Sequence, residues 1–278
     1  MNEVLRRTAA TLARHLTLVG TSAFVLMPFI WMLSLSIKPP SEAFGRTVQF
    51  WPDRFYGLEN YSEAIFGSPL LRFMLNGAFV CVVTLGLQIL IAAPMAYALA
   101  KLRFAGRDFM FGSVLVGLRI PIEVLAIPLF IAFHHLGLLN SYTALILPGV
   151  ISPFAIFLFR QYFRAIPDDL IAAARLDGLS EFAIVWRIMV PSAMPAVIAF
   201  AMLSVVGRWN DLFWPLTFIR SEDLMTPALG IVRFRNEEVG NAYGPLMAAA
   251  VVVVTPMILL FLLAQRRFVE GLATSGLK

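Results

Sequence analysis

The chain has 278 residues, of which 59% are hydrophobic and 14% are charged. A soluble domain of this length could not bury that much apolar surface, so the composition excludes a soluble protein and indicates a membrane protein. The formal net charge is +5, which indicates contact with anionic lipid head groups rather than nucleic acid. Cys81 is the only cysteine, which excludes a disulfide or a cysteine-based metal site within the chain.

Six apolar runs are long enough to cross a bilayer, because a span needs about 20 residues to cross roughly 30 Å of hydrocarbon. Backbone groups in lipid must be satisfied within their own segment, so we expect these runs to be helices. The expected fold class is an all-α membrane protein with a single transmembrane domain over residues 1–278. The expected spans are residues 16–37, 73–99, 109–133, 142–159, 193–218 and 244–264.

The distribution of basic residues predicts the orientation of these spans. With the N-terminus inside, thirteen of the 22 Lys and Arg residues fall in cytoplasmic segments and seven in outer segments. We therefore expect both termini in the cytoplasm. The first run is followed by Lys38 and two prolines rather than by a small-residue cleavage site, so we interpret it as a retained span and not as a signal peptide.

A polar hairpin, residues 160–192, separates the fourth and fifth apolar runs and must lie in water or against another protein. Its pattern predicts two short helices. Asp168 and Asp169 fall in the first turn of the first helix, where negative charge complements the helix dipole. Gly178 favours the end of that helix, and Ser180 is a typical N-cap for the second. We interpret the hairpin as a binding element for a partner subunit.

The two hairpin helices differ in the surfaces that they offer. In the second, Phe182, Val185, Trp186 and Met189 follow one another at i, i+3, i+4 and i+7. We therefore expect these four side chains on one face, packed under the spans. The first helix carries three consecutive alanines, residues 172–174, whose small side chains would let another surface approach closely.

Four charged residues fall within the expected spans, where a charge at mid-bilayer costs about 2.5–3.5 kcal/mol. Arg119 and Glu123 are four residues apart, and Arg208 and Asp211 are three apart, so each pair is expected on one helix face. Two interpretations stay open: the pairs are self-neutralising and structural, or they line a translocation path.

In the second interpretation, aromatic and amide side chains beside the last pair would contact a passing solute. Trp209 and Trp214 would stack on it, and Asn210 would hydrogen-bond to it. Arginines in such a path would also suit an anionic solute, although the two carboxylates offset their charge.

The sequence lacks the motifs of catalysis. It has no Ser/His/Asp set, no carboxylate pair and no His/Cys metal spacing, so we expect no catalytic residue, no metal site and no enzyme activity. A Walker A loop needs a Gly-Lys dipeptide, which the sequence does not contain. Any ATP hydrolysis must therefore come from a partner.

Several segments resemble the carbohydrate branch of ABC-importer permeases, from about residue 58 to the end of the chain. The hairpin residues 167–178, PDDLIAAARLDG, together with Pro191, resemble the EAA loop of these permeases. Further segments similar to motifs of the family are AYALAKLRFAGR (96–107), GLLNSY (137–142), FLFRQYF (157–163), WNDLFWP (209–215) and QRRFVEG (265–271).

The resemblance implies six transmembrane helices with type I ABC-importer permease architecture, in the bacterial inner membrane. The implied partners are a sister permease, two ATPase subunits that hold ATP and Mg²⁺, and an extracytoplasmic solute-binding protein. The chain itself would bind no cofactor. The hairpin would be the coupling helix that enters a cleft on an ATPase. The residues to which the resemblance gives this role are Asp168, Asp169, Ala172, Ala173, Ala174, Arg175, Asp177 and Gly178.

One position departs from the family pattern, because Ala172 stands where the motif has a glutamate that contributes to docking. We expect docking to depend instead on shape and on Arg175 and Asp177, with the sister permease making the stronger contact. In maltose-type relatives the outer loop, residues 219–243 here, reaches toward the binding protein's solute cleft. This likeness assigns a binding-protein contact to Arg233, Arg235, Glu237 and Glu238.

Two other classes of protein are weighed against the importer. An ion-coupled secondary transporter would use the charged pairs within the spans as a relay. Such a carrier has no need of a hairpin built for a cytosolic partner, and it tends to have two similar halves, which the sequence lacks. A non-transporting membrane scaffold would leave the charges unexplained. We therefore expect an importer subunit for a sugar or sugar derivative.

Overall fold

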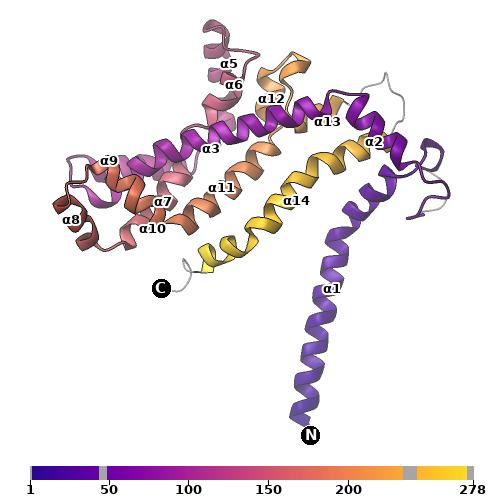
Figure 1. Ribbon diagram of the computed structural model, residues 1–278, viewed down its shortest axis with the longest axis horizontal. Helices are drawn as coiled ribbons and strands as arrows, with labels where there is room; N and C mark the ends of the chain where they lie inside the picture. The colour runs from indigo at the N-terminus through magenta and orange to yellow at the C-terminus, as the bar shows by residue number, and fades with distance from the viewer. Residues whose placement is uncertain (1, 44–48, 234–242, 274–278) are drawn as a thin grey trace. The chain divides into compact units, whose positions relative to one another are not determined.

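The computed structural model describes residues 2–43, 49–233 and 243–273, and these residues form helices and connecting turns without a strand (Figure 1). The chain divides into two compact units, Met1–Leu70 with Arg233–Thr255, and Leu71–Val232 with Pro256–Lys278. In chain order the elements are α1 (Asn2–Ser36), η1 (Pro40–Glu42), α2 (Gly57–Phe66), α3 (Leu70–Lys101), α4 (Arg107–Gly117), η2 (Ile122–Leu125), α5 (Ala126–His135), α6 (Tyr142–Ile146), η3 (Leu147–Gly149), α7 (Pro153–Ala165), α8 (Asp168–Leu176), α9 (Glu181–Ile184), η4 (Val185–Met189), α10 (Val190–Ser192), α11 (Met194–Trp209), α12 (Phe213–Phe218), η5 (Glu222–Leu224), α13 (Pro227–Arg233) and α14 (Tyr243–Ala273).

Three helices in the described part of the chain are long and apolar enough to cross a membrane, namely Ala10–Ser36, Leu70–Lys101 and Tyr243–Gln265. They contain most of the expected first, second and sixth spans. Three further candidates are helix pairs that meet at a bend: α4 with η2 and α5 at 92°, α6 and η3 with α7 at 43°, and α9 to α10 with α11 at 83°. The described residues therefore supply up to six spans if each bent pair crosses once.

Prolines lie at each of the three bends. Pro121 precedes η2, and the residue before a proline is pushed out of the helical conformation. At the start of α7, Ser152 accepts a hydrogen bond from Ala155 N at 3.2 Å, and Pro153 occupies the first turn. Pro195 lies in the first turn of α11. A proline in the first turn is compatible with a helix that begins there, so each bend marks a new helix start.

The expected fifth span, residues 193–218, is not one helix in the structure. It is divided into α11 and α12 by a short break, at which polar side chains bond to the backbone. The amide of Asn210 donates to Val206 O at 2.9 Å, and a carboxylate oxygen of Asp211 accepts from Trp214 N at 3.2 Å. These bonds end one helix and begin the next, in competition with a continuous helical ladder.

The core of the larger unit joins α3, α7 and α11 to the hairpin. Ala93 and Ala96 on α3 belong to the same buried cluster as Phe159 on α7 and Phe200 on α11. The two phenylalanine rings meet edge-on, with centroids 5.6 Å apart. Figure 1 shows α8 and α9 at the end of α3 that carries Lys101. The spans and the hairpin of this unit therefore share one core.

The second hairpin helix contains a π-helical turn, Val185–Met189, which changes the set of side chains that face the core. Ile184 and Met189, five residues apart, are both fully buried, whereas Phe182 is 60% exposed. The expected apolar stripe is therefore wrong at Phe182, because a π turn holds more residues than the 3.6 per turn on which the stripe was based. Val185 and Met189 are buried as expected.

In the smaller unit, a polar network holds the segment between α1 and α2. The amide of Asn60 donates to Ser36 O at 3.0 Å and to Lys38 O at 2.8 Å. Lys38 is itself buried, donates to Gln49 O, and places its ammonium 5.1 Å from the centroid of the Trp31 ring. A buried ammonium group needs such partners, so Lys38 fixes the path of this segment.

Candidate functional site

The first part of the hairpin folds as the sequence predicts. α8 begins at Asp168 and ends with two backbone hydrogen bonds, from Gly178 N to Arg175 O and from Leu179 N to Ala174 O, each at 3.0 Å. Gly178 has a φ of 80°, a left-handed conformation that glycine adopts without strain. This arrangement is a Schellman motif, which satisfies the last carbonyl groups of the helix.

The second helix also begins as expected, since the Ser180 hydroxyl accepts a hydrogen bond from Ala183 N at 3.3 Å. The two faces of α8 differ. Ile171 and Ala174 are buried, whereas Ala172 and Ala173 are exposed. The expected surface of three alanines is therefore wrong at Ala174, because this residue follows Ile171 by three positions and shares its buried face.

Two side chains on the last turns of α3 reach the hairpin. Lys101 Nζ donates to Ile166 O at 2.5 Å and to Asp168 Oδ1 at 2.6 Å. The hydrogen bond and positive charge of Lys101 lower the pKa of Asp168, so this carboxyl is ionised at neutral pH. Tyr97 OH donates to Glu181 Oε2 at 2.5 Å.

The far end of α8 is joined to α9 by a bidentate ion pair. Arg175 Nε donates to Glu181 Oε1 at 2.8 Å, and Arg175 Nη2 donates to Glu181 Oε2 at 3.2 Å. Arg175 Nη2 also lies 3.4 Å from Tyr97 OH. The hydrogen bond to Glu181 raises the pKa of Arg175. The Arg175 guanidinium is thus already engaged within the hairpin.

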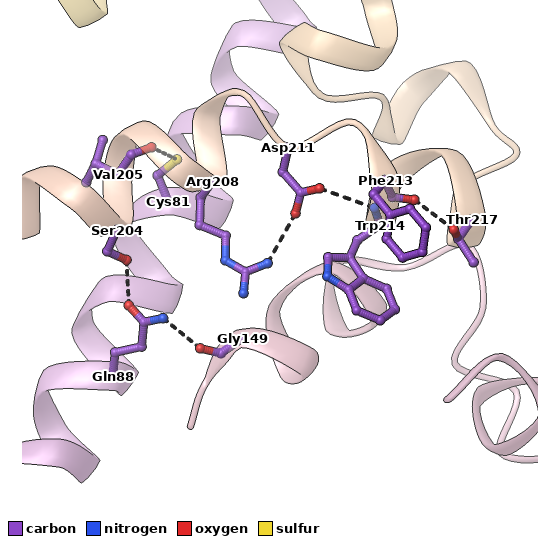
Figure 2. A network of polar contacts seen from close by, with 10 residues as sticks. All are labelled: Cys81, Gln88, Gly149, Ser204, Val205, Arg208, Asp211, Phe213, Trp214 and Thr217. Atoms are coloured by element: carbon purple, nitrogen blue, oxygen red, sulfur yellow. Dashed lines mark hydrogen bonds and ion pairs between the residues drawn. The ribbon is translucent and has the colours of Figure 1, made fainter. Parts of the chain in front are cut away.

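A second polar cluster lies between α3, η3 and α11 (Figure 2). Gln88 is buried in α3, where its amide nitrogen donates to Gly149 O at 2.7 Å and its oxygen accepts from Ser204 Oγ at 2.6 Å. Beside it, Arg208 Nη1 donates to Asp211 Oδ2 at 3.2 Å. A Cβ atom at Gly149 would collide with the Arg208 guanidinium, so glycine is what lets the arginine lie there.

An open cavity of about 360 Å³ adjoins this cluster. It brings together three of the charged residues that the sequence indicated, one guanidinium and two carboxylates, with several aromatic rings. The residues that line it are Gln88, Ile122, Glu123, Ser152, Phe154, Phe200, Leu203, Ser204, Gly207, Arg208, Asp211, Phe213 and Trp214. Carboxylates, amides and flat rings together are the groups that hydrogen-bond and stack on a polyhydroxylated ligand.

The model of one protein family, described as the binding-protein-dependent transport system inner membrane component, matches residues 88–273. The chain belongs to this family. Its membership explains the apolar helices, since the family is an inner membrane component of a transport system.

Curated relatives of this permease match it over nearly its whole length. The arabinooligosaccharides transport system permease protein AraQ of Halalkalibacterium halodurans is 36% identical over 98% of this chain and 99% of its own. The diacetylchitobiose uptake system permease protein NgcG of Streptomyces coelicolor is 32% identical, over 94% and 87%. The lactose transport system permease protein LacG of Rhizobium radiobacter is 30% identical, over 99% of each. These relatives are transport permeases of sugar systems and not enzymes, and this chain is likewise a transport component.

Two solved structures share the fold of this permease. A bacterial ABC transporter involved in the import of the acidic polysaccharide alginate matches with a TM-score of 0.82 at 24% identity, over 92% of this chain and 95% of that one. A bacterial alginate ABC transporter in complex with an alginate pentasaccharide-bound periplasmic protein matches with a TM-score of 0.63 at 15% identity, over 95% and 94%. At these identities the likeness is one of fold, and it confirms the expected all-helical ABC-permease class.

The first charged pair of the permease departs from expectation. Arg119 lies in the break after α4, and Glu123 lies in η2; both are exposed, and they form no ion pair with each other among the described contacts. The expectation that they share one helix face is wrong, because α4 ends at Gly117. Glu123 lines the cavity and Arg119 does not.

The aromatic and amide residues beside the second pair do not all lie at the cavity. Trp214 borders the cavity, but it is only 3% exposed and its ring stacks on Phe218. Trp209 is buried outside the lining, and Asn210 turns back to its own helix. For the outer loop, Arg233 is the last residue of α13. Its side chain, and the residues Arg235, Glu237 and Glu238, lie outside what the structure describes.

Four residues with structural partners in this permease were missed at the sequence level. Gln88 and Ser204 carried a usable signal, because a polar side chain in an apolar span needs a partner in the same way as a charge does. Tyr97 and Lys101 carried none, since their contacts depend on how the hairpin folds back onto α3.

Proposed function

We propose that this chain is one transmembrane subunit of an ATP-driven, binding-protein-dependent importer for a sugar or sugar derivative. The observation that carries the proposal is α8, an ordered polar helix that leaves Ala172, Ala173 and the 90% exposed Leu176 uncovered. An exposed leucine beside two alanines is suited to insertion into a cleft on another protein. The relatives named above serve arabinooligosaccharides, diacetylchitobiose and lactose, which supports a sugar as the solute.

In this proposal the chain pairs with a sister permease in the bacterial inner membrane, with both termini in the cytoplasm and lipid around the spans. Two ATPase subunits bind ATP and Mg²⁺, and an extracytoplasmic binding protein delivers the solute. The loop that contains Arg233, Arg235, Glu237 and Glu238 contacts that binding protein. The excess of basic residues in the inner segments supports this orientation.

Docking on the ATPase involves the exposed side of α8. Asp169 and Asp177 are exposed and accept hydrogen bonds from the partner, while Asp168 is bound to Lys101. Arg175 contributes less than the family pattern implies, because Glu181 already holds its guanidinium. Shape complementarity at Ala172 and Ala173 and the turn at Gly178 complete the contact.

The solute path passes the cavity that Glu123, Arg208 and Asp211 line. Glu123 is exposed and makes no ion pair among the described residues, so its carboxylate oxygens can reach sugar hydroxyl groups. The 41% exposed Phe213 ring offers a stacking surface, whereas the Trp214 ring is buried against Phe218. The lining holds two carboxylates and one guanidinium, so its charge supports a neutral sugar over an anionic one.

The class is tested by tagging the chain in its host, extracting the membranes in mild detergent and identifying the proteins that co-purify. We expect a Walker-containing ATPase and a second permease. Ala172→Arg should abolish recovery of the ATPase, because a long charged side chain replaces a methyl group at the contact. Ala105→Arg, on the exposed basic turn after α3, is the matched control and should leave recovery unchanged.

The outcomes separate the two classes of transporter. Recovery of the chain alone, with uptake of arabinotriose, diacetylchitobiose or lactose that persists after ATP depletion, would overturn the importer and indicate an ion-coupled secondary transporter. Recovery of the ATPase with Ala172→Arg as efficiently as with wild type would show that α8 is not the docking surface.

A further inference from the structure

The last turns of α3 contact α8 at both of its ends. Tyr97 and Lys101 are four residues apart and so lie on one face of α3, about 6 Å apart along its axis. Lys101 donates a hydrogen bond to Asp168, the first residue of α8. Tyr97 donates to Glu181, and Glu181 in turn accepts from Arg175 in the last turn of α8. Two neighbouring positions on one helix therefore hold both ends of another.

The donors of these contacts are buried, while their carboxylate acceptors, Asp168 and Glu181, are 85% and 47% exposed. The Lys101 side chain is only 7% exposed, so its ammonium depends on its two acceptors, Ile166 O and the Asp168 carboxylate. Tyr97 is 2% exposed and donates to a carboxylate that a bidentate arginine holds in place. Hydrogen bonds in which one partner is ionised are about twice as strong as neutral ones.

The end of α3 is in turn anchored to two other helices. Arg160 of α7 donates from Nε to Leu99 O at 3.1 Å, and its guanidinium carbon lies 3.6 Å from the centroid of the Phe111 ring of α4. Arg160 is buried, so this contact is shielded from solvent. The last turns of α3 are thus a junction at which α4, α7 and α8 meet.

The backbone leaves α8 at both ends through a turn and not through a continuous helix. Ile166 is extended, with ψ of 131°, and Gly178 has a positive φ, so no continuous helix leads out of α8 in either direction. Apart from the packing of Ile171 and Ala174 in the core, the polar contacts to α3 are what keep the helix from pivoting on these two turns. Without them, a displacement of α8 would reach the spans through flexible backbone.

We propose that Tyr97 and Lys101 are positioning residues that clamp α8 to α3, so that a displacement of α8 passes directly to that span. This role rests on the proposed docking of α8 on an ATPase. It extends the proposed function by naming the span that receives the motion and the side chains that transmit it. The alternative is that the same contacts only stabilise the hairpin.

The test uses the intact complex with the double variant Tyr97→Phe, Lys101→Met. The first change removes only a hydroxyl group, and the second keeps the length and apolar stem of lysine. Both positions lie on α3 and not on the surface proposed to contact the ATPase. Arg103→Met is the matched control, because Arg103 is an exposed cation that acts on Asp168 only through its charge and makes no hydrogen bond among the described contacts.

Uptake and ATP hydrolysis are measured together in proteoliposomes, with arabinotriose, diacetylchitobiose and lactose as probes. We expect the double variant to assemble and hydrolyse ATP at the wild-type rate, while uptake per ATP falls about tenfold, because two charge-assisted hydrogen bonds to solvent-exposed carboxylates are lost together. The control should behave as wild type. An unchanged ratio of uptake to ATP, or a fall in assembly, hydrolysis and uptake in equal proportion, would leave only a structural role and overturn the clamp.

A second measurement needs no sugar. Hydrogen exchange of the α8 amides in the purified complex should be about tenfold faster in the double variant than in wild type and in the control; unchanged exchange overturns the clamp. If no ATPase accompanies the wild-type chain, the proposed function fails and the coupling role with it. If the ATPase is present and exchange and uptake per ATP are unchanged, the clamp alone fails.

Discussion

The two carboxylates that line the cavity are in different electrostatic situations. Asp211 accepts hydrogen bonds from Arg208 and from Trp214 N, and the side chains of the Arg208–Asp211 pair are only 14% and 17% exposed. Glu123 is exposed and has no ion pair among the described residues. Asp211 is therefore needed by the fold at the break between α11 and α12, whereas Glu123 has free oxygens for a solute.

This difference predicts that one isosteric change lowers sugar uptake and that the other lowers the stability of the chain. Glu123→Gln should leave the free energy of unfolding within about 0.5 kcal/mol of wild type, as for other exposed residues. It should nevertheless lower sugar uptake about tenfold, because an amide replaces a charged hydrogen-bond acceptor. Asp211→Asn should destabilise the chain by about 1–3 kcal/mol, because the partly buried Arg208 loses its ionic partner.

Stability is measured in detergent with a thiol-reactive dye, since the single cysteine, Cys81, is buried and becomes reactive on unfolding. Uptake is measured with the sugar probes named above. Equal uptake by wild type and Glu123→Gln, together with a loss of stability in Asp211→Asn, would mean that the charges are structural. The cavity would then not lie on the solute path.

At the scale of the element, the hairpin separates what local sequence determines from what packing determines. The stop at Gly178 and the cap at Ser180 were predictable, because each depends on one residue and its neighbours. The π turn was not, since it depends on which side chains fill the core beneath α9 and η4. The same limit applies to Tyr97, whose partner lies far along the chain.

The π register predicts which hairpin side chains support the fold. Ile184→Ala should cost about 2–5 kcal/mol, the range for removing a fully buried aliphatic side chain. Phe182→Ala should cost about 0.5 kcal/mol or less, because this ring is mostly exposed. Both values are read from unfolding of the purified chain with the same dye. A helix without the π turn predicts the reverse order, so a larger loss for Phe182→Ala would contradict the register.

At the scale of the whole molecule, apolar length predicted three continuous apolar helices but not the bends in the other candidate spans. α1, α3 and α14 are continuous although each contains a proline, at Pro28, Pro94 and Pro256. The other candidates bend by 43° to 92°. A proline alone therefore does not decide between a straight and a bent span. At the bends, capping side chains and neighbouring helices satisfy the backbone groups that a break exposes.

The bend of 92° between α4 and α5 leaves two topologies to separate by experiment. If the pair crosses the membrane once, Leu136, which is 68% exposed after α5, faces the outside. A pair that enters and returns on one side would leave it in the cytoplasm. The excess of basic residues in the segments assigned to the inside favours a crossing. We therefore expect Leu136→Cys to react with a membrane-impermeant maleimide in intact spheroplasts.

Two matched positions calibrate this measurement. Trp51→Cys, 80% exposed after the first span, should react in intact spheroplasts in either topology, and Ala105→Cys, before α4, should react only after permeabilisation. The buried Cys81 keeps the background low. Reaction of Leu136→Cys only after permeabilisation would make the pair a re-entrant loop. If every other candidate spans, the chain would then cross the membrane an odd number of times. Its two termini would lie on opposite sides, which would contradict the proposed orientation.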